Sequence, residues 1–346
     1  MKYKTVLVPL TMPLVLAACL GGGGGSGGSG WRNFTSFENI NPNQRVQFQS
    51  GGGSVNYAGT AAAPGASVDR AGTYSKEGAR LRVRFGDLPE PLEGEDPDPD
   101  AIPDIRSLEL RVNLPDGTVT RTFDGESIAD VGGGLAADRF IVLEIESEPV
   151  GEVPAVVTDR LYVVDFEELG LEYMTFGLWE LGLDGTSRNI GGAAFGALTP
   201  VSGTNSMPAI GTATYTGELI GYQVQATSTV VHVADSTLVA DFAAPTVTFS
   251  SSGTRRLVDG VDASNLNIAP SPADITGNTF RGNVSLAGTD CCPGEFGGAF
   301  FGPEAAEAGG WFEVTNINPA EGFEDNLNDR YFGSFGGKRD IPPPAP

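Results

Sequence analysis

The chain has 346 residues, a formal net charge of −23, 49 glycines and 24 prolines. This charge excludes nucleic acid as a partner, because a phosphate backbone is bound by clustered basic residues. The length allows two modest domains, and a composition rich in glycine and proline favours an all-β fold with many turns.

The first 18 residues have the pattern of a bacterial export signal. Lys2 and Lys4 precede an apolar stretch of about a dozen residues, which is shorter than the roughly 20 that a membrane-spanning helix needs. The stretch ends in Leu16-Ala17-Ala18-Cys19, which resembles the lipobox of bacterial lipoproteins. We therefore expect residues 1–18 to be a signal peptide and Cys19 to carry the lipid. An ordinary signal peptide with a chance cysteine is the alternative.

Residues 19–30 predict a tether between the lipid and a folded body. Apart from Ser26 and Ser29, residues 21–30 are all glycine, and such a segment behaves as a flexible coil with a reach of roughly 20 Å. Leu20 stands where a retention signal for the inner membrane would have aspartate. Nothing at this position therefore resembles that retention signal.

Residues 31–205 predict a β-rich domain. Leu81, Val83 and Phe85 alternate with arginines, which is the period-two pattern of a half-buried strand. Residues 108–114 show the same alternation. Further strand candidates are residues 139–147, 160–168, 173–181 and 193–198.

The loop at residues 87–104 is acidic and contains no basic residue. The spaced carboxylates of Asp96, Asp98 and Asp100 are candidate calcium ligands. The loop lacks, however, the glycine and the terminal glutamate of an EF-hand. A solvated acidic loop is the favoured interpretation, with calcium binding as the alternative.

Residues 206–337 predict a second β domain, followed by a proline-rich tail at residues 338–346. Short apolar segments follow one another closely here, with glycine and asparagine between them. Such spacing is typical of a sandwich or a barrel. Because a closed sheet has no exposed edges, we expect this domain to fold without the first. The strand candidates are residues 212–217, 221–225, 229–233, 237–242, 246–250, 279–286, 297–302, 310–314 and 330–335.

Three side chains invite a chemical role. His232 is the only histidine; it is a candidate haem ligand, but a lone histidine in a strand is more often a surface or partly buried side chain. Cys291 and Cys292 are adjacent, and with Cys19 lipidated they can pair only with each other. Their Cα atoms lie no more than about 3.8 Å apart, short of the usual disulfide spacing. A strained vicinal disulfide is slightly favoured over two free thiols. We identify no catalytic set and no metal site, and expect no enzyme activity.

The stretch Gly297–Gly310, which reads GGAFFGPEAAEAGG, resembles the barrel signature of the transferrin-binding protein B family of surface lipoproteins. Residues 211–217 and 238–242 resemble two further barrel strands. Phe300 and Phe301 fall on opposite faces of a strand, so one should fill the barrel and the other should point outward or to the first domain.

The resemblance implies a handle domain at residues 31–205 followed by a barrel of eight strands, with length for a single lobe. It implies an outer-membrane lipoprotein that faces the cell exterior and captures a ligand for iron acquisition. This ligand is either an iron-carrier protein similar to transferrin or haem, with haem as a ligand rather than a cofactor. A TonB-dependent outer-membrane receptor is an implied partner. The alternative is a non-enzymatic interaction lipoprotein that binds a host regulator or another envelope protein. The ligand-binding residues stay unknown at this point.

Overall fold

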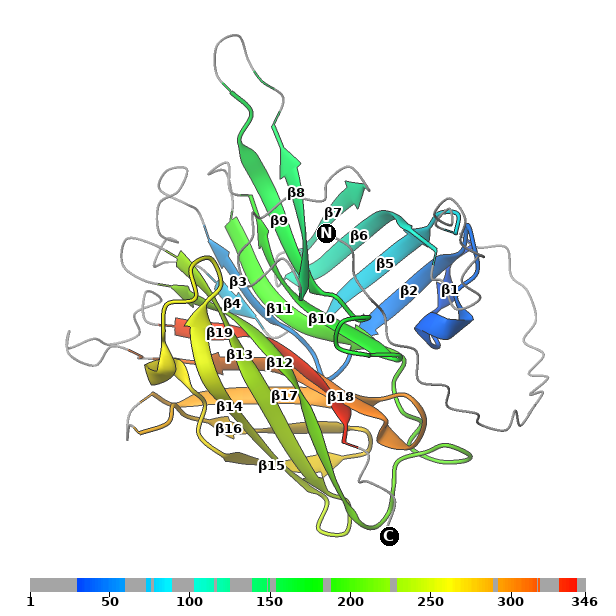
Figure 1. The fold of residues 1–346 in the computed structure, drawn as a ribbon, viewed down its shortest axis with the longest axis vertical. Helices are drawn as coiled ribbons and strands as arrows, with labels where there is room; N and C mark the ends of the chain where they lie inside the picture. Colours follow the sequence, from blue (N-terminus) through cyan, green and yellow to red (C-terminus); the bar gives the residue numbers. More distant parts are fainter. Residues whose placement is uncertain are drawn as a thin grey trace, which may run out of the picture. The chain divides into compact units, whose positions relative to one another are not determined.

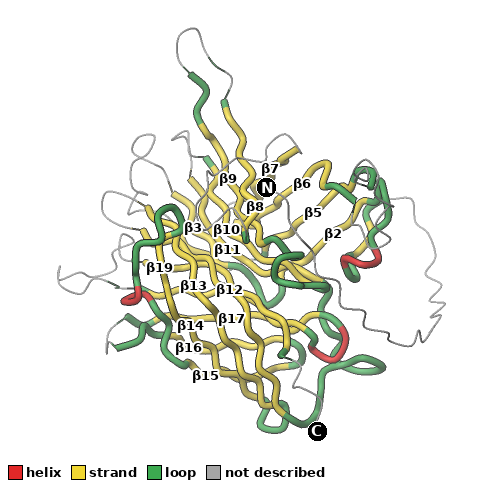
Figure 2. The backbone as a smooth tube through the Cα atoms, viewed as in Figure 1, coloured by secondary structure: helices red, strands yellow, loops and turns green. Residues whose placement is uncertain are grey.

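The fold is described from a computed structural model of the chain (Figure 1). The structure describes residues 30–59, 73–75, 78–88, 103–114, 117–124, 139–147, 149, 154–182, 188–224, 229–288, 292–315, 317 and 330–340. Within these ranges the secondary structure is strand, apart from short 3₁₀ turns (Figure 2). The turns are η1 (Phe37–Asn39), η3 (Ser264–Leu266) and η4 (Pro303–Ala305). The predicted all-β class is confirmed.

The first half of the body, the handle, is a sheet whose main path runs β7-β6-β5-β2-β11-β10-β9-β8. The short strand β1 pairs with β2, and β3 pairs with β4 and β11. The sheet is strongly curved, as Figure 1 shows. Its strands are β1 (Arg32–Asn33), β2 (Arg45–Ser50), β3 (Val55–Gly59), β4 (Thr73–Ser75), β5 (Ala79–Phe85), β6 (Ile105–Leu114), β7 (Gly117–Asp124), β8 (Phe140–Glu146), β9 (Val157–Val164), β10 (Met174–Leu181) and β11 (Arg188–Gly196).

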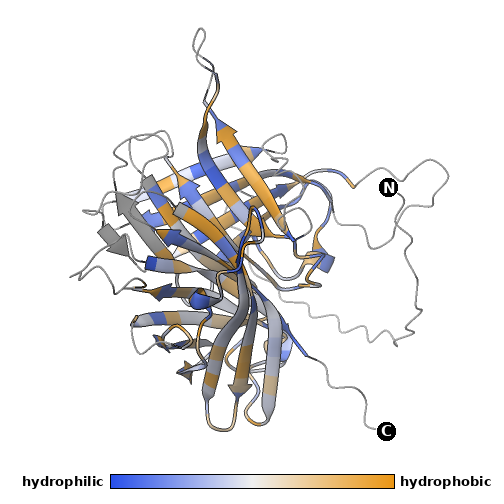
Figure 3. Cartoon of the chain, turned by 60° about the vertical axis from the view of Figure 1, so that its left-hand side comes forward, coloured by the Kyte–Doolittle hydropathy of each residue, from blue (hydrophilic) through white to orange (hydrophobic). Residues whose placement is uncertain are grey.

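Alternating side chains explain why the handle sheet curves around a core. On β5, Leu81, Val83 and Phe85 are buried, whereas the arginines between them lie on the other face. The buried faces of β2, β5, β6 and β11 join those of β9 and β10 in one apolar cluster. Figure 3 shows polar and apolar residues interleaved along these strands. The period-two pattern of the sequence therefore specifies which face is inside.

The second half is a closed antiparallel barrel of eight strands, β12 to β19 in chain order. Each strand pairs with the next, and β19 pairs back to β12 from Tyr215↔Arg339 to Val224↔Arg330. Every strand edge is thus satisfied within the sheet. The strands are β12 (Thr212–Val224), β13 (Thr229–Asp241), β14 (Thr246–Arg256), β15 (Ser271–Thr276), β16 (Thr279–Val284), β17 (Gly294–Phe301), β18 (Glu307–Val314) and β19 (Arg330–Arg339).

The barrel strands differ from the segments expected from the sequence in their bounds, and also in their number. The candidates at 212–217 and 221–225 form the single strand β12, and those at 229–233 and 237–242 form β13, which continues through a register shift between Val233 and Asp235. The sequence pattern missed β15, which contains Pro272. Strand β19 ends at Arg339 rather than at 335, beyond the bound of 337 expected for the domain, because Lys338 and Arg339 still pair with β12. Ladder hydrogen bonding, rather than apolar content, decides these bounds.

Phe300 and Phe301 occupy opposite faces of β17, as alternation predicted. Phe300 lies in the barrel core, and its ring centroid is 5.8 Å from that of Tyr215. Phe301 belongs to a different cluster, which also contains handle residues such as Phe176. Both rings are completely buried. Phe300 therefore fills the barrel, and Phe301 fills the junction between the barrel and the handle.

The junction is itself an apolar core. Handle strands β8 to β11 contribute one side, and the outward faces of β12, β17, β18 and β19 contribute the other. Ile220, Tyr222, Trp311 and Phe332 are outward-pointing barrel residues, and each is at most 2% exposed. Residues 31–346 cluster as one compact unit. The barrel closes its own edges, but its outer face depends on the handle for burial.

Candidate functional site

Polar contacts fix the handle to the barrel around the shared apolar core. Glu307 of β18 accepts the backbone N–H groups of Glu172 and Tyr173, the latter at 2.9 Å. Burial raises the pKa of Glu307 from 4.5 to about 7, although the two donors oppose that rise. The Trp311 indole N–H donates to the carbonyl of Gly52 at 2.9 Å. A carboxylate and an indole from one strand thus hold two separate handle segments.

A second polar group lies at the same junction. Tyr222 of β12 donates its hydroxyl to Glu180 of β10, and Arg160 of β9 forms ion pairs with Glu180 and Glu144. Glu180 is buried, and a buried carboxylate requires such partners to be stable. Next to it, Arg139 forms an ion pair with Glu218 of β12. The Tyr222–Glu180 and Arg139–Glu218 contacts join the handle to the barrel and orient the two parts with respect to each other.

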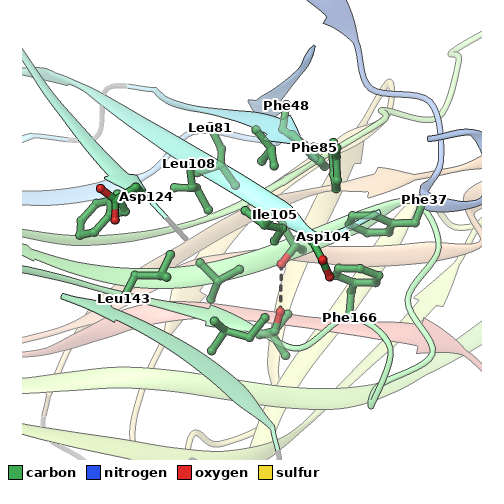
Figure 4. Close-up of a pocket in the computed structure, with 16 residues that line it drawn as sticks. Phe37, Phe48, Leu81, Phe85, Asp104, Ile105, Leu108, Asp124, Leu143 and Phe166 are labelled. Atoms are coloured by element: carbon green, nitrogen blue, oxygen red, sulfur yellow. Dashed lines mark hydrogen bonds between the residues drawn. The ribbon is translucent and has the colours of Figure 1, made fainter. Parts of the chain in front are cut away.

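Handle residues line an apolar cavity of about 440 Å³ that is partly open to solvent (Figure 4). Phe85, Ile105 and Leu108 border it on one side, and Leu143 borders it on the other. Phe37 and Phe166 are stacked, with ring centroids 3.7 Å apart, and form part of the wall. This volume falls within the range of small-molecule pockets. The cavity is therefore suited to an apolar molecule or an alkyl chain.

The chemistry of this cavity does not fit haem. Iron in haem is held by histidine, cysteine, methionine or tyrosine, and none of these types is among the 16 lining residues. The polar side chains at the wall are Asp104, Asp124 and Thr175, and Thr175 donates its hydroxyl to the Val164 carbonyl at 3.4 Å. Two aspartates also repel the carboxylates that haem carries.

His232 lies inside the barrel, opposite Val231 and Val233, as alternation predicted. It is only 4% exposed, so the expectation of a surface or partly buried side chain is wrong. Its Nε2 lies 3.0 Å from Oε1 of Gln223, and its ring meets that of Tyr331 edge-on at 6.0 Å. Burial lowers its pKa from 6.5 to about 4, so the ring is neutral at physiological pH. Enclosure in the packed barrel makes it a core residue.

The remaining predicted residues lie at the margins of the described structure. Cys19 lies outside it, as does Cys291. Cys292 is buried, has a φ of 73° and is disulfide-bonded, but a bridge to Cys291 stays a prediction. Most of the acidic loop at 87–104 is also outside the described residues. Within them, no group of three or more metal-ligating side chains occurs, and no helix is long and apolar enough to cross a membrane.

The outer side of the handle carries a basic surface that the sequence analysis did not single out. We call it the arginine face; it consists of Arg45 on β2, Arg80, Arg82 and Arg84 on β5, and Arg111 on β6. The signal in the sequence was the alternation itself, because the residues between Leu81, Val83 and Phe85 must share the opposite face. In a chain with a net charge of −23, this is a local exception.

A closed eight-stranded barrel that shares an apolar core with a curved handle sheet defines a handle-and-barrel lobe. Residues 207–339 match the family model described as the C-lobe and N-lobe beta barrels of Tf-binding protein B. The resemblance to transferrin-binding protein B is therefore confirmed, and it rests on the barrel. Residues 31–205 lie outside this match. No curated protein matches the chain.

Solved structures with a similar arrangement are more distant. The apo structure of the haemoglobin receptor HpuA from Kingella denitrificans is 17% identical in sequence. The match covers 90% of this chain and 94% of the HpuA chain, with a TM-score of 0.40. Transferrin-binding protein B from Haemophilus parasuis Hp5, as a Trp-176-Ala mutant, is 14% identical, with 86% and 76% coverage and a TM-score of 0.34. The isotype 1 protein from serogroup B Neisseria meningitidis is 12% identical, with 86% and 77% coverage and a TM-score of 0.34. Sequence identities and TM-scores this low do not indicate a ligand for this chain.

Proposed function

We propose that this chain is an outer-membrane lipoprotein, anchored through Cys19 and exposed at the cell surface, that captures an iron-carrying protein without catalysing a reaction. The observation that carries the proposal is the match of residues 207–339 with the barrels of Tf-binding protein B. The handle that shares a core with this barrel supports it, because the pair offers a rigid lobe of the kind a receptor needs. A TonB-dependent outer-membrane receptor would take up the captured iron.

The cavity and the histidine favour a carrier protein over free haem as the ligand. The handle cavity has no side chain that holds haem iron among its lining residues. His232 is buried in the barrel and its Nε2 is already in contact with Gln223. Among the described residues, neither of these two places offers haem an iron ligand without displacing packed core residues, whereas a folded carrier can be bound by the outer surface of the lobe.

Binding measurements on residues 31–346 test this proposal. The immobilised body is exposed to haemoglobin, to iron-loaded and iron-free transferrin, and to free haem. We expect saturable binding of an iron-carrying protein and none of free haem. Stoichiometric binding of free haem alone would identify haem, and not a carrier protein, as the ligand. If none of these ligands bound, a host regulator or another envelope protein would be favoured as the partner.

The anchor needs its own experiment. Cys19→Ser removes the thiol to which the lipid is attached, so the variant should remain unprocessed and lose its membrane attachment. Ala18→Gly is the matched control, because it keeps a small residue before an intact cysteine and should mature normally. Normal maturation of the Cys19→Ser variant would contradict the lipoprotein assignment.

A further inference from the structure

The arginine face brings like charges close together across neighbouring strands. The strand register places Arg45 directly opposite Arg84, and Arg80 directly opposite Arg111. Like charges in such cross-strand pairs destabilise a sheet. In the part of the chain that the structure describes, Arg82 is the member with an ion pair, to Glu109 at 2.9 Å. Among the described residues, the other four arginines of the face have no ion-pair partner, so an external anion can serve as their counterion.

A polar hollow lies on the same face. It has a volume of about 350 Å³ and lies between Arg80 and Arg111. Gln49 and Asn113 add amide groups to its wall. Guanidinium groups bind phosphate through paired N–H donors, and amides can donate further hydrogen bonds. The hollow thus has the donor set and the charge for a phosphate group.

Trp31, the first residue of the compact body, lies against this face. The Trp31 ring lies over two of the arginines, with Cζ of Arg82 5.1 Å and Cζ of Arg84 5.7 Å from the ring centroid. The segment of residues 19–30 therefore joins the body beside the arginine face. Its reach is roughly 20 Å, so a lipid on Cys19 would keep this face close to the membrane surface. Tryptophan itself is enriched at bilayer interfaces.

We propose that the arginine face binds the phosphate groups of anionic lipids, and that the handle thereby docks on the membrane to which the chain is tethered. The location of the contact rests on the proposed lipid anchor, but the phosphate binding does not. The net charge of −23 does not prevent docking, because at physiological salt interactions beyond about 8 Å are largely screened. Within that distance the arginine side chains meet the headgroups first.

Vesicle co-sedimentation of residues 31–346 tests the proposal without the anchor. We expect binding to vesicles that contain phosphatidylglycerol, no binding to pure phosphatidylcholine, and weaker binding as sodium chloride is raised. The triple variant Arg45→Gln, Arg84→Gln, Arg111→Gln should bind the anionic vesicles roughly 100-fold more weakly. Its thermal unfolding should be unchanged or shifted upward, because the like-charge pairs are relieved.

A matched triple variant on the barrel, Arg255→Gln, Arg281→Gln, Arg339→Gln, changes the net charge equally and should keep the binding. Equal losses in both variants would show a general charge effect and overturn the proposal. So would equal binding to neutral vesicles. Inorganic phosphate should displace the vesicles more strongly than chloride at equal ionic strength, because free phosphate competes for the same guanidinium groups. Equal displacement by the two anions would contradict recognition of the phosphate group. Equally tight binding of polyglutamate would assign the face to an acidic protein instead. The vesicle experiment uses residues 31–346 without the lipid. A failure of vesicle binding is therefore distinguishable from a failure of the Cys19 experiment.

Discussion

The carboxylate of Glu307 and the backbone N–H of Tyr173 lie 2.9 Å apart and join the barrel to the handle. The two residues are 134 positions apart in the sequence. A buried carboxylate at such a point makes the stability of the lobe sensitive to pH, because protonation changes the charge at the junction.

Stability should fall as the pH rises from about 4.5 to about 7. Burial raises the pKa of Glu307 to about 7 in the folded protein, whereas the unfolded chain ionises near 4.5. Between these values the unfolded state binds fewer protons, so a higher pH favours it. Urea denaturation of residues 31–346 at a series of pH values measures this. Glu307→Gln should remove that part of the pH dependence, and Glu295→Gln, a more exposed carboxylate on β17, should retain it. Identical profiles for Glu307→Gln and the parent would contradict the prediction.

The imidazole of His232 should stay neutral well below its usual range. Burial lowers its pKa to about 4, so the unfolded chain takes up a proton near 6.5 and the folded protein does not. The stabilising effect is complete above 6.5 and is lost as the pH falls towards 4, opposite in sign to the effect of Glu307. Since His232 is the only histidine, a single NMR resonance reports its titration. A midpoint near 6.5 in the folded protein would place the ring in solvent.

Phe301→Ala should destabilise residues 31–346 as much as Phe300→Ala, by about 3–5 kcal/mol each. Both rings are fully buried, one at the junction and one in the barrel. Chemical denaturation gives both free energies of unfolding. A negligible cost for Phe301→Ala would mean that the handle does not cover β17.

The isolated barrel provides the contrasting measurement. Residues 206–339 would expose Ile220, Tyr222, Trp311 and Phe332, an apolar surface of the kind that causes association. We therefore expect self-association in sedimentation velocity rather than the independent monomeric folding expected from the sequence. There, Phe301→Ala should cost much less than Phe300→Ala.

The handle cavity should accept a larger side chain. Leu108 and Leu110 lie on the same face of β6, but only Leu108 lines the cavity. Leu108→Phe should cost less than about 1 kcal/mol or stabilise the fold, whereas Leu110→Phe overpacks a filled core and should cost about 1–3 kcal/mol. Thermal unfolding compares the two variants. An equal cost would mean that the cavity is closed in solution.

The sequence by itself determined the elements whose pattern is local. Alternation along residues 81–85 predicted both the buried face of β5 and the opposite placement of its arginines. The same rule separated Phe300 from Phe301, and the Gly297–Gly310 stretch led to the barrel family. These predictions hold because the direction of a side chain in a strand follows from the backbone period alone.

Only the tertiary structure decided what lies against each face. Nothing local shows that Tyr222 and Trp311, both outward on the barrel, are covered by the handle, or that His232 is enclosed beside Tyr331. Strand β15 escaped prediction because Pro272 breaks the apolar pattern, although its neighbours still pair with β14 and β16. Trp31 reaches Arg82 and Arg84 because β1 pairs with β2. Burial and charge pairing arise from strands distant in sequence, so the closure of the two sheets, and not any one segment, determines them.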